Sequence, residues 1–183
     1  MLPERPPHDP PPGRSGSRRS DPASSLAGLP GVCHHAFAVR IRDFLLLVYD
    51  ALTPLLPKRL RQHEWRVRFS LLQVYFESPA VHYEVWVQKK NRRIELGLHF
   101  EGDPDENYGW AAALAPRALE IQSQLGPAVE LEEWTRDWTR LHETRPFEGQ
   151  LDAALAQQTA ERLAAFITTL EPILAEERAA VAR

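Results

Sequence analysis

Two neighbouring runs of alternating residues, at 81–88 and 94–101, constrain the fold more than any other part of this sequence. In each run apolar residues alternate with polar, small or amphipathic ones, which is the period-two pattern of a half-buried β-strand. The sequence therefore predicts an antiparallel hairpin with one apolar face and one mostly polar face. A polar stretch typical of a turn separates the two runs: Lys89-Lys90-Asn91-Arg92-Arg93.

Placing Asn91 and Arg92 at the centre of the turn predicts which residues of the hairpin face each other. Both faces then hold compatible neighbours, which favours this register. On the apolar face the predicted pairs are Tyr83 with Phe100, Val85 with Leu98, and Val87 with Leu96. On the polar face they are His82 with Glu101, Glu84 with His99, and Trp86 with Gly97, where the ring would cover the glycine.

Helix and strand patterns precede the hairpin. Residues 35–53 carry apolar residues at helical spacing, and Pro54 and Pro57 are expected to end that helix. Residues 64–69 alternate as a strand does. Residues 70–77 fit either a strand or a helix, and we favour a strand.

A predicted helix follows the hairpin, with Asp103 as its N-cap and Gly126 as its stop. Pro116 lies inside this segment and should kink or divide it. Residues 129–144 predict one long or two short strands, and residues 150–182 predict a helix kinked at Pro172. The predicted class is α+β, with an antiparallel sheet of about three to five strands. An N-terminal helix, a middle helix and a long C-terminal helix are expected to pack on that sheet.

Composition divides the chain into two parts. Residues 1–30 hold eight of the 16 prolines and five serines, so this segment is expected to be a disordered tail. A proline-rich ligand for a partner domain, at 10–12, is the alternative. A single α+β domain is predicted over residues 34–183. No apolar run suits a secretory signal or a membrane span, so a cytoplasmic protein without membrane contact is expected.

Missing motifs exclude several classes of enzyme. A single cysteine, Cys33, rules out an internal disulfide and a zinc site made only of cysteines. The chain has no G-x-G-x-x-G, H-E-x-x-H or G-x-S-x-G, and no strand acid with a lysine two residues later, as in a nuclease core. No cofactor is predicted, apart from a divalent metal if the polar face of the hairpin binds one.

The polar face of the hairpin offers a candidate metal site. Imidazole and carboxylate groups suit zinc, manganese or iron, and Glu95 nearby is a candidate general base. The alternative is that these residues are ordinary cross-strand pairs on a polar face. The candidate ligands are His82, Glu84, His99 and Glu101.

Charge is unevenly distributed along the chain, although the formal net charge is only −3. Nine basic residues against three acidic ones lie between Lys58 and Arg93. Basic residues beside an aromatic ring could bind a nucleic-acid backbone or a protein partner, while the alternative is a solvated strand edge and turn. Trp110, Trp134 and Trp138 are expected in the core. The candidate patch is Arg59, Arg61, Trp65, Arg66, Arg68, Lys89, Lys90, Arg92 and Arg93.

Short matches within residues 94–147 resemble a bacterial domain family of unknown function. That family often lies C-terminal in larger proteins, some of them nuclease-like. The resemblance implies a bacterial, intracellular protein in a DNA-related setting, and it brings no catalytic residues. This chain has Tyr108 where the family usually has lysine. The resemblance rests on Ile94-Glu95-Leu96, Glu106-Asn107, Glu120-Ile121, Leu125-Gly126, Glu133-Trp134 and Arg140-Leu141.

Two functions follow as hypotheses. The sequence favours a non-catalytic binding or interaction module, associated with nucleic-acid transactions. The alternative is a metal-dependent hydrolase or nuclease-like enzyme that uses the histidine and glutamate residues of the hairpin. Geometry distinguishes them: convergence of those side chains in a pocket favours the enzyme, whereas an open face or a covering helix favours the module.

Overall fold

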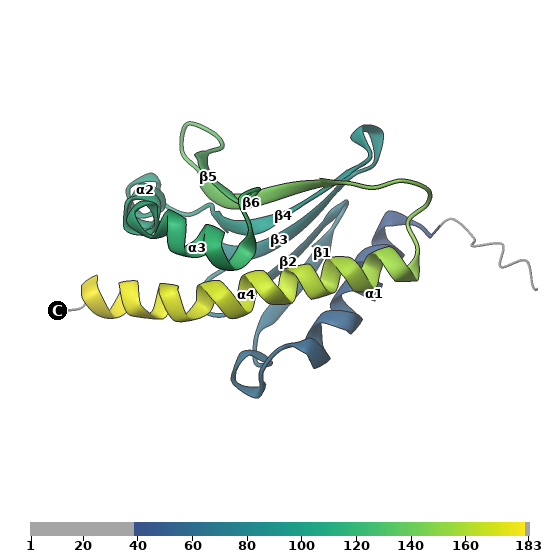
Figure 1. The fold of residues 1–183 in the computed structure, drawn as a ribbon, viewed down its shortest axis with the longest axis horizontal. Helices are drawn as coiled ribbons and strands as arrows, with labels where there is room; N and C mark the ends of the chain where they lie inside the picture. The colour runs from purple at the N-terminus through teal and green to yellow at the C-terminus, as the bar shows by residue number, and fades with distance from the viewer. Residues whose placement is uncertain (1–38, 182–183) are drawn as a thin grey trace, which may run out of the picture. The chain divides into compact units, whose positions relative to one another are not determined.

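The computed structural model describes residues 39–181. It contains a six-stranded antiparallel sheet in the order β1-β2-β3-β4-β6-β5 (Figure 1). The α+β class is confirmed, with one strand more than the upper end of the predicted range. The strands are β1 Glu64–Arg68, β2 Leu71–Tyr75, β3 Val81–Gln88, β4 Arg93–Phe100, β5 Glu130–Glu133 and β6 Thr139–Pro146.

Both ambiguous segments of the sequence form strands. Residues 71–75 are a strand, as favoured, and a two-residue turn at Phe69 and Ser70 joins β1 to β2. Residues 130–146 form two short strands rather than one long one. The expected tail at 1–30 and Cys33 lie outside the described residues.

Two helices cover the apolar face of the sheet. Helix α1 spans Ile41–Leu55 and helix α4 spans Ala153–Val181, and Figure 1 shows α4 running along the sheet with α1 beside it. Their apolar stripes bury the alternate side chains of the central strands, as the two periodicities require. The core therefore lies on one side of the sheet and leaves the other face to polar residues. Fully buried core residues include Phe44, Leu52, Val85, Leu98, Phe166 and Leu170.

Helix α1 continues through Pro54, which we expected to end it. Proline removes one hydrogen bond in the last turn but does not prevent the final carbonyl groups from finding partners. Arg61 donates to two of these carbonyl groups, 3.1 Å from Pro54 O and 2.8 Å from Leu56 O. Leu56 is extended, as expected for a residue before proline, and the chain leaves the helix there.

The middle helix is divided as predicted. Helix α2, Pro104–Leu114, begins at Asp103, whose carboxylate accepts a hydrogen bond from Asp105 N at 2.9 Å. A short 3₁₀ turn containing Pro116 separates it from helix α3, Ala118–Leu125, which ends at Gly126. In α4, Pro172 lies inside the helix, which continues to Val181.

The predicted register of the central hairpin is wrong by two residues. The connection is a 3₁₀ turn at Lys89–Asn91 followed by Arg92, whose φ of 51° is left-handed, and Gln88 pairs with Arg93. A longer loop shifts each partner by two positions, so every side chain keeps its predicted face. The observed polar pairs are His82 with His99, Glu84 with Gly97, and Trp86 with Glu95.

Candidate functional site

The polar face of the sheet is built from alternate residues of neighbouring strands. His82 and Glu84 lie on β3, and His99 lies beside His82 on β4. Gln73 on β2 pairs with Glu84 from the other side. The two-residue correction of the register therefore changes the neighbours of each side chain while leaving the same polar residues on one surface.

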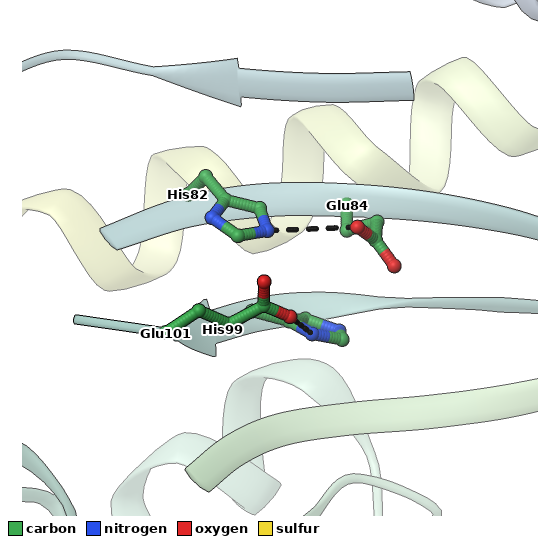
Figure 2. Close-up of side chains that lie close together, drawn as sticks. All are labelled: His82, Glu84, His99 and Glu101. Atoms are coloured by element: carbon green, nitrogen blue, oxygen red, sulfur yellow. Dashed lines mark ion pairs between the residues drawn. The ribbon is translucent and has the colours of Figure 1, made fainter. Parts of the chain in front are cut away.

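The four candidate ligands predicted from the sequence converge in the structure. One ligand atom from each of His82, Glu84, His99 and Glu101 lies within 4.8 Å of all the others. Figure 2 shows the close pairs: His82 Nε2 lies 3.5 Å from Glu84 Oε2, and His99 Nδ1 lies 3.5 Å from Glu101 Oε1. The two imidazole rings stack with their centroids 5.6 Å apart. Small movements of these side chains would bring all four atoms to the spacing of ligands around a single ion.

Burial separates Glu101 from the other three residues. The side chains of His82, His99 and Glu84 are at most 3% exposed, whereas that of Glu101 is 19% exposed. Buried charged groups need partners, because loss of hydration is costly. Glu101 is the member of the cluster with the best access to solvent.

Hydrogen bonding defines the tautomer of His82. Its Nδ1 lies 2.8 Å from Pro79 O. A carbonyl oxygen only accepts, so Nδ1 must donate, and neutral His82 therefore has an unprotonated Nε2 facing the cluster. A backbone carbonyl orienting one ring nitrogen so that the other can bind is the usual arrangement behind a metal-binding histidine.

His99 is the unexplained residue of the cluster. Its ring is 1% exposed, yet neither nitrogen makes a hydrogen bond within residues 39–181. Nδ1 faces Glu101, while Nε2 lies 3.9 Å from Glu95 Oε1, too far for a hydrogen bond. An edge-to-face contact with Trp134 holds the ring, with centroids 5.7 Å apart. A buried imidazole without partners is costly unless something else binds it.

Gln73 is part of this site, although nothing in the sequence pointed to it beyond its place in a predicted strand. Its Nε2 donates to Glu84 Oε2 at 2.7 Å and lies 2.9 Å from His82 Nε2. Its Oε1 accepts from Arg66 Nε at 2.6 Å, which fixes the orientation of the amide. Gln73 therefore satisfies His82 and Glu84, and a metal ion would have to displace its amide nitrogen from both.

The carboxylates of this face have displaced pKa values. Burial alone would raise the pKa of Glu84, but the adjacent His82 and His99 and the hydrogen bond from Gln73 outweigh burial and lower it. Burial raises the pKa of Glu95, and the opposing effects of Arg140 and His99 are too small to reverse it. Glu84 is therefore favoured as an anion, which is the form that binds a cation.

Glu95, our candidate general base, is occupied elsewhere. It accepts hydrogen bonds from Arg140 Nη1 and, at 3.1 Å, from Gln88 Nε2. Arg140 also binds Glu132 on β5 through Nε at 2.8 Å. Glu95 lies 3.9 Å from His99 Nε2 and is absent from the lining of the groove above the cluster, so its geometry suits a supporting role.

A groove of about 450 Å³ opens above the cluster. Glu84 and Glu101 contribute to it, so the candidate site is accessible from this side. Trp134 and Trp138 line it instead of joining the core as expected, and Trp138 is 36% exposed. The turn from Trp134 to Trp138 between β5 and β6 removes these rings from the helix-covered face. The remaining lining residues are Arg66, Arg68, Phe69, Ser70, Leu71, Gln73 and Trp86.

The predicted basic patch is distributed over different environments. Arg66 and Arg68 line the groove, whereas Trp65 stacks on Tyr49 of α1 at 4.0 Å. Arg61 caps α1, as described above. Arg92 donates to Gly149 O at 3.1 Å. The remaining members, Arg59, Lys89, Lys90 and Arg93, are exposed, and none of them lines the groove.

A second cluster, Glu130, Glu132 and His142, has metal-like spacing at the edge of the sheet. Glu132 already binds Arg140 and lies 3.0 Å from His142 Nε2. Burial and the charge of Arg140 lower the pKa of His142 to about 4. With its central carboxylate engaged by an arginine, this cluster is the weaker candidate.

Comparison with known proteins adds no assignment to this geometry. No family model, curated protein or solved structure matches the chain. The resemblance of residues 94–147 to a bacterial domain family therefore stays a prediction. Among the described residues, no helix has the length and apolar character needed to cross a membrane.

Proposed function

We propose that this protein is a metal-dependent hydrolase, with a divalent ion such as zinc held by His82, Glu84 and His99. The observation that carries the proposal is His99, a buried imidazole without hydrogen-bond partners inside a set of ligand-type atoms. Two histidines and a carboxylate, with a fourth position left open, form a common catalytic zinc set. The open position would face the groove.

Glu101 fits the role of general base in this scheme. It lies beside His99, lines the groove, and is more exposed than the three proposed ligands. A water molecule bound at the open position would lose a proton to Glu101, because a divalent cation lowers the pKa of water. The hydroxide oxygen would bond to the electrophilic centre of the substrate, the bond to the leaving group would break, and Glu101 would return the proton to that group.

Zinc binding to the metal-free protein is the direct test. After treatment with EDTA, titration with zinc chloride should show about one zinc ion bound per chain. The bound zinc should raise the melting temperature of the protein. Glu84→Gln, which keeps the shape of the side chain, should weaken zinc binding at least about tenfold. Glu132→Gln, in the second cluster, is the matched control and should bind zinc like the wild type.

Replacement of Glu101 separates binding from chemistry. Glu101→Gln should keep the bound zinc and lose most hydrolysis of p-nitrophenyl phosphate and p-nitrophenyl acetate, by about 100-fold or more. Absence of stoichiometric zinc, manganese or iron in the wild-type protein would refute the proposal.

A second candidate is the non-catalytic binding module favoured by the sequence. The observation in its favour is the amide of Gln73, which already satisfies His82 and Glu84 without a metal. Under this function Glu84→Gln would lower stability, while added zinc would leave the melting temperature of every variant unchanged.

A further inference from the structure

The rim of the groove carries an aromatic residue that the fold itself does not need. Phe69 is 96% exposed, so its ring contributes almost nothing to the core. Its φ of 49° is left-handed, in a two-residue hairpin turn where glycine or asparagine is usual. A bulky side chain in this conformation is strained, and strain of this kind is concentrated at functional sites.

Other aromatic rings line the same groove. Trp134 lies between Trp86 and Trp138, with ring centroids 6.2 and 5.9 Å away. Trp138 is partly exposed to solvent, and Phe69 is almost fully exposed. Exposed aromatic faces in a groove can stack on planar ligands such as nucleobases.

Positive charge lies on the β1 side of the groove. The side chain of Arg68 makes no hydrogen bond or ion pair with any other described residue, so its guanidinium is available to a ligand. Arg66 donates through Nε to Gln73, and its guanidinium lies 5.9 Å from the centre of the Tyr75 ring. Guanidinium groups match phosphate oxygens in geometry and charge.

We propose that the groove binds a mononucleotide, with the base against Phe69 and Trp138 and the phosphate between Arg68 and the metal site. This inference deepens the proposed hydrolase, on which its chemistry rests. A volume of about 450 Å³ suits one small ligand, which favours a free nucleotide over a strand. The hairpin-tip lysines do not line the groove, which also favours the small ligand.

The implied reaction is hydrolysis of a phosphate monoester. The hydroxide oxygen bonds to phosphorus, the bond from phosphorus to the ester oxygen breaks, and that oxygen takes the proton from Glu101. The products are a nucleoside and inorganic phosphate, and no oxidant or reductant is involved.

Calorimetric titration of the full chain with AMP, adenosine and ribose 5-phosphate tests the assignment. AMP should bind at least about tenfold more tightly than either fragment, because only AMP supplies both the base and the phosphate. Phe69→Asn should weaken AMP about fivefold or more and leave ribose 5-phosphate unchanged. The same substitution should leave the melting temperature unchanged or higher, since asparagine tolerates left-handed φ. A merely structural Phe69 would not separate binding from stability in this way.

Arg68→Gln tests the phosphate contact. It should weaken AMP about tenfold or more and leave adenosine unaffected. Lys90→Gln, at the exposed hairpin tip, is the charge control, and Leu119→Asn, an exposed apolar residue outside the groove, is the control for Phe69. Both controls should bind AMP like the wild type.

Titrations in EDTA and in zinc separate this inference from the proposed function. Suppose that the protein binds no zinc, and that AMP binding depends on Phe69 and Arg68. This result would support the nucleotide-binding groove and refute the proposed hydrolase. Zinc binding without AMP binding would support the metal site and refute the nucleotide-binding groove. Equal affinity for AMP and ribose 5-phosphate would overturn the mononucleotide assignment. Much tighter binding of a single-stranded oligonucleotide, weakened by Lys90→Gln, would also overturn it.

Discussion

Gly97 is the residue at which the polar face tolerates least change. It pairs with Glu84 on β3 and with His142 on β6. A Cβ atom at this position would lie 2.4 Å from Leu141 O and 2.6 Å from the Cα of His142. These are backbone atoms that cannot rotate away, so the close approach of β4 and β6 requires glycine.

Gly97→Ala is expected to destabilise the protein by about 2–3 kcal/mol or more, because overpacking would force the strands apart. Urea unfolding at pH 7 measures the loss. Gly109→Ala in α2 is the matched control, since a Cβ there meets nothing within 4 Å. The control should be neutral or slightly stabilising, by about 0.5–1 kcal/mol. Similar effects at both positions would contradict the proposed close approach.

Gln73 competes with a metal for His82 and Glu84. Replacing it with methionine removes the amide that satisfies both residues in the metal-free protein. Because the metal-free state alone loses these hydrogen bonds, Gln73→Met should bind zinc about fivefold more tightly. Weaker zinc binding in this variant would show that the amide supports the site.

At the scale of elements, Arg162 joins three parts of the fold. Its Nε donates to Glu143 on β6 at 2.8 Å, and its Nη2 donates to Leu125 O at the end of α3. The guanidinium also lies over the ring of Phe166, 5.0 Å from its centre. Glu143 is only 5% exposed, so this arginine neutralises a buried charge while it fastens α4 to the sheet.

Arg162→Met should therefore lower the free energy of unfolding by about 2–4 kcal/mol. The loss should be smaller than for a fully unpaired buried charge, because Arg145 remains 3.8 Å from Glu143. The free energy of unfolding in urea is the measurement. Arg117→Gln is the control, because Arg117 binds the more exposed Glu120 and Glu176. It should change stability far less, as is usual for surface pairs.

Turns at the ends of elements explain which local predictions held and which did not. The N-cap at Asp103 and the break at Pro116 depend on neighbouring residues, so the sequence predicts both correctly. Pro54 does not end α1, because Arg61 from the following turn supplies donors to its last carbonyl groups. The register of the hairpin was missed because Arg92 adopts a left-handed φ, which lengthens the loop.

At the scale of the whole molecule, the buried polar face makes stability depend on pH. Burial and Arg140 lower the pKa of His142 from 6.5 to about 4. Between these values the unfolded chain binds a proton that the folded chain does not, so stability should fall as pH falls from 6.5 towards 4.

Metal-free protein should lose about 1–3 kcal/mol from this histidine between pH 7 and pH 4.5. His142→Gln removes the titrating group, so the difference in stability between those two pH values should be smaller in the variant. Urea unfolding in EDTA at both values provides the comparison. An unchanged difference would show that His142 is not the origin of the pH dependence.

Sequence patterns were sufficient to predict the α+β class, most of the elements and the set of polar residues on one face of the central hairpin. These features depend on periodicity and on local caps, which a single segment carries within itself. Three features emerge only from the folded chain: His82 faces His99, Gln73 joins them, and Trp134 and Trp138 leave the core to line a groove. Each of these depends on a turn conformation or on a partner strand distant in sequence, and hydrophobic alternation constrains neither.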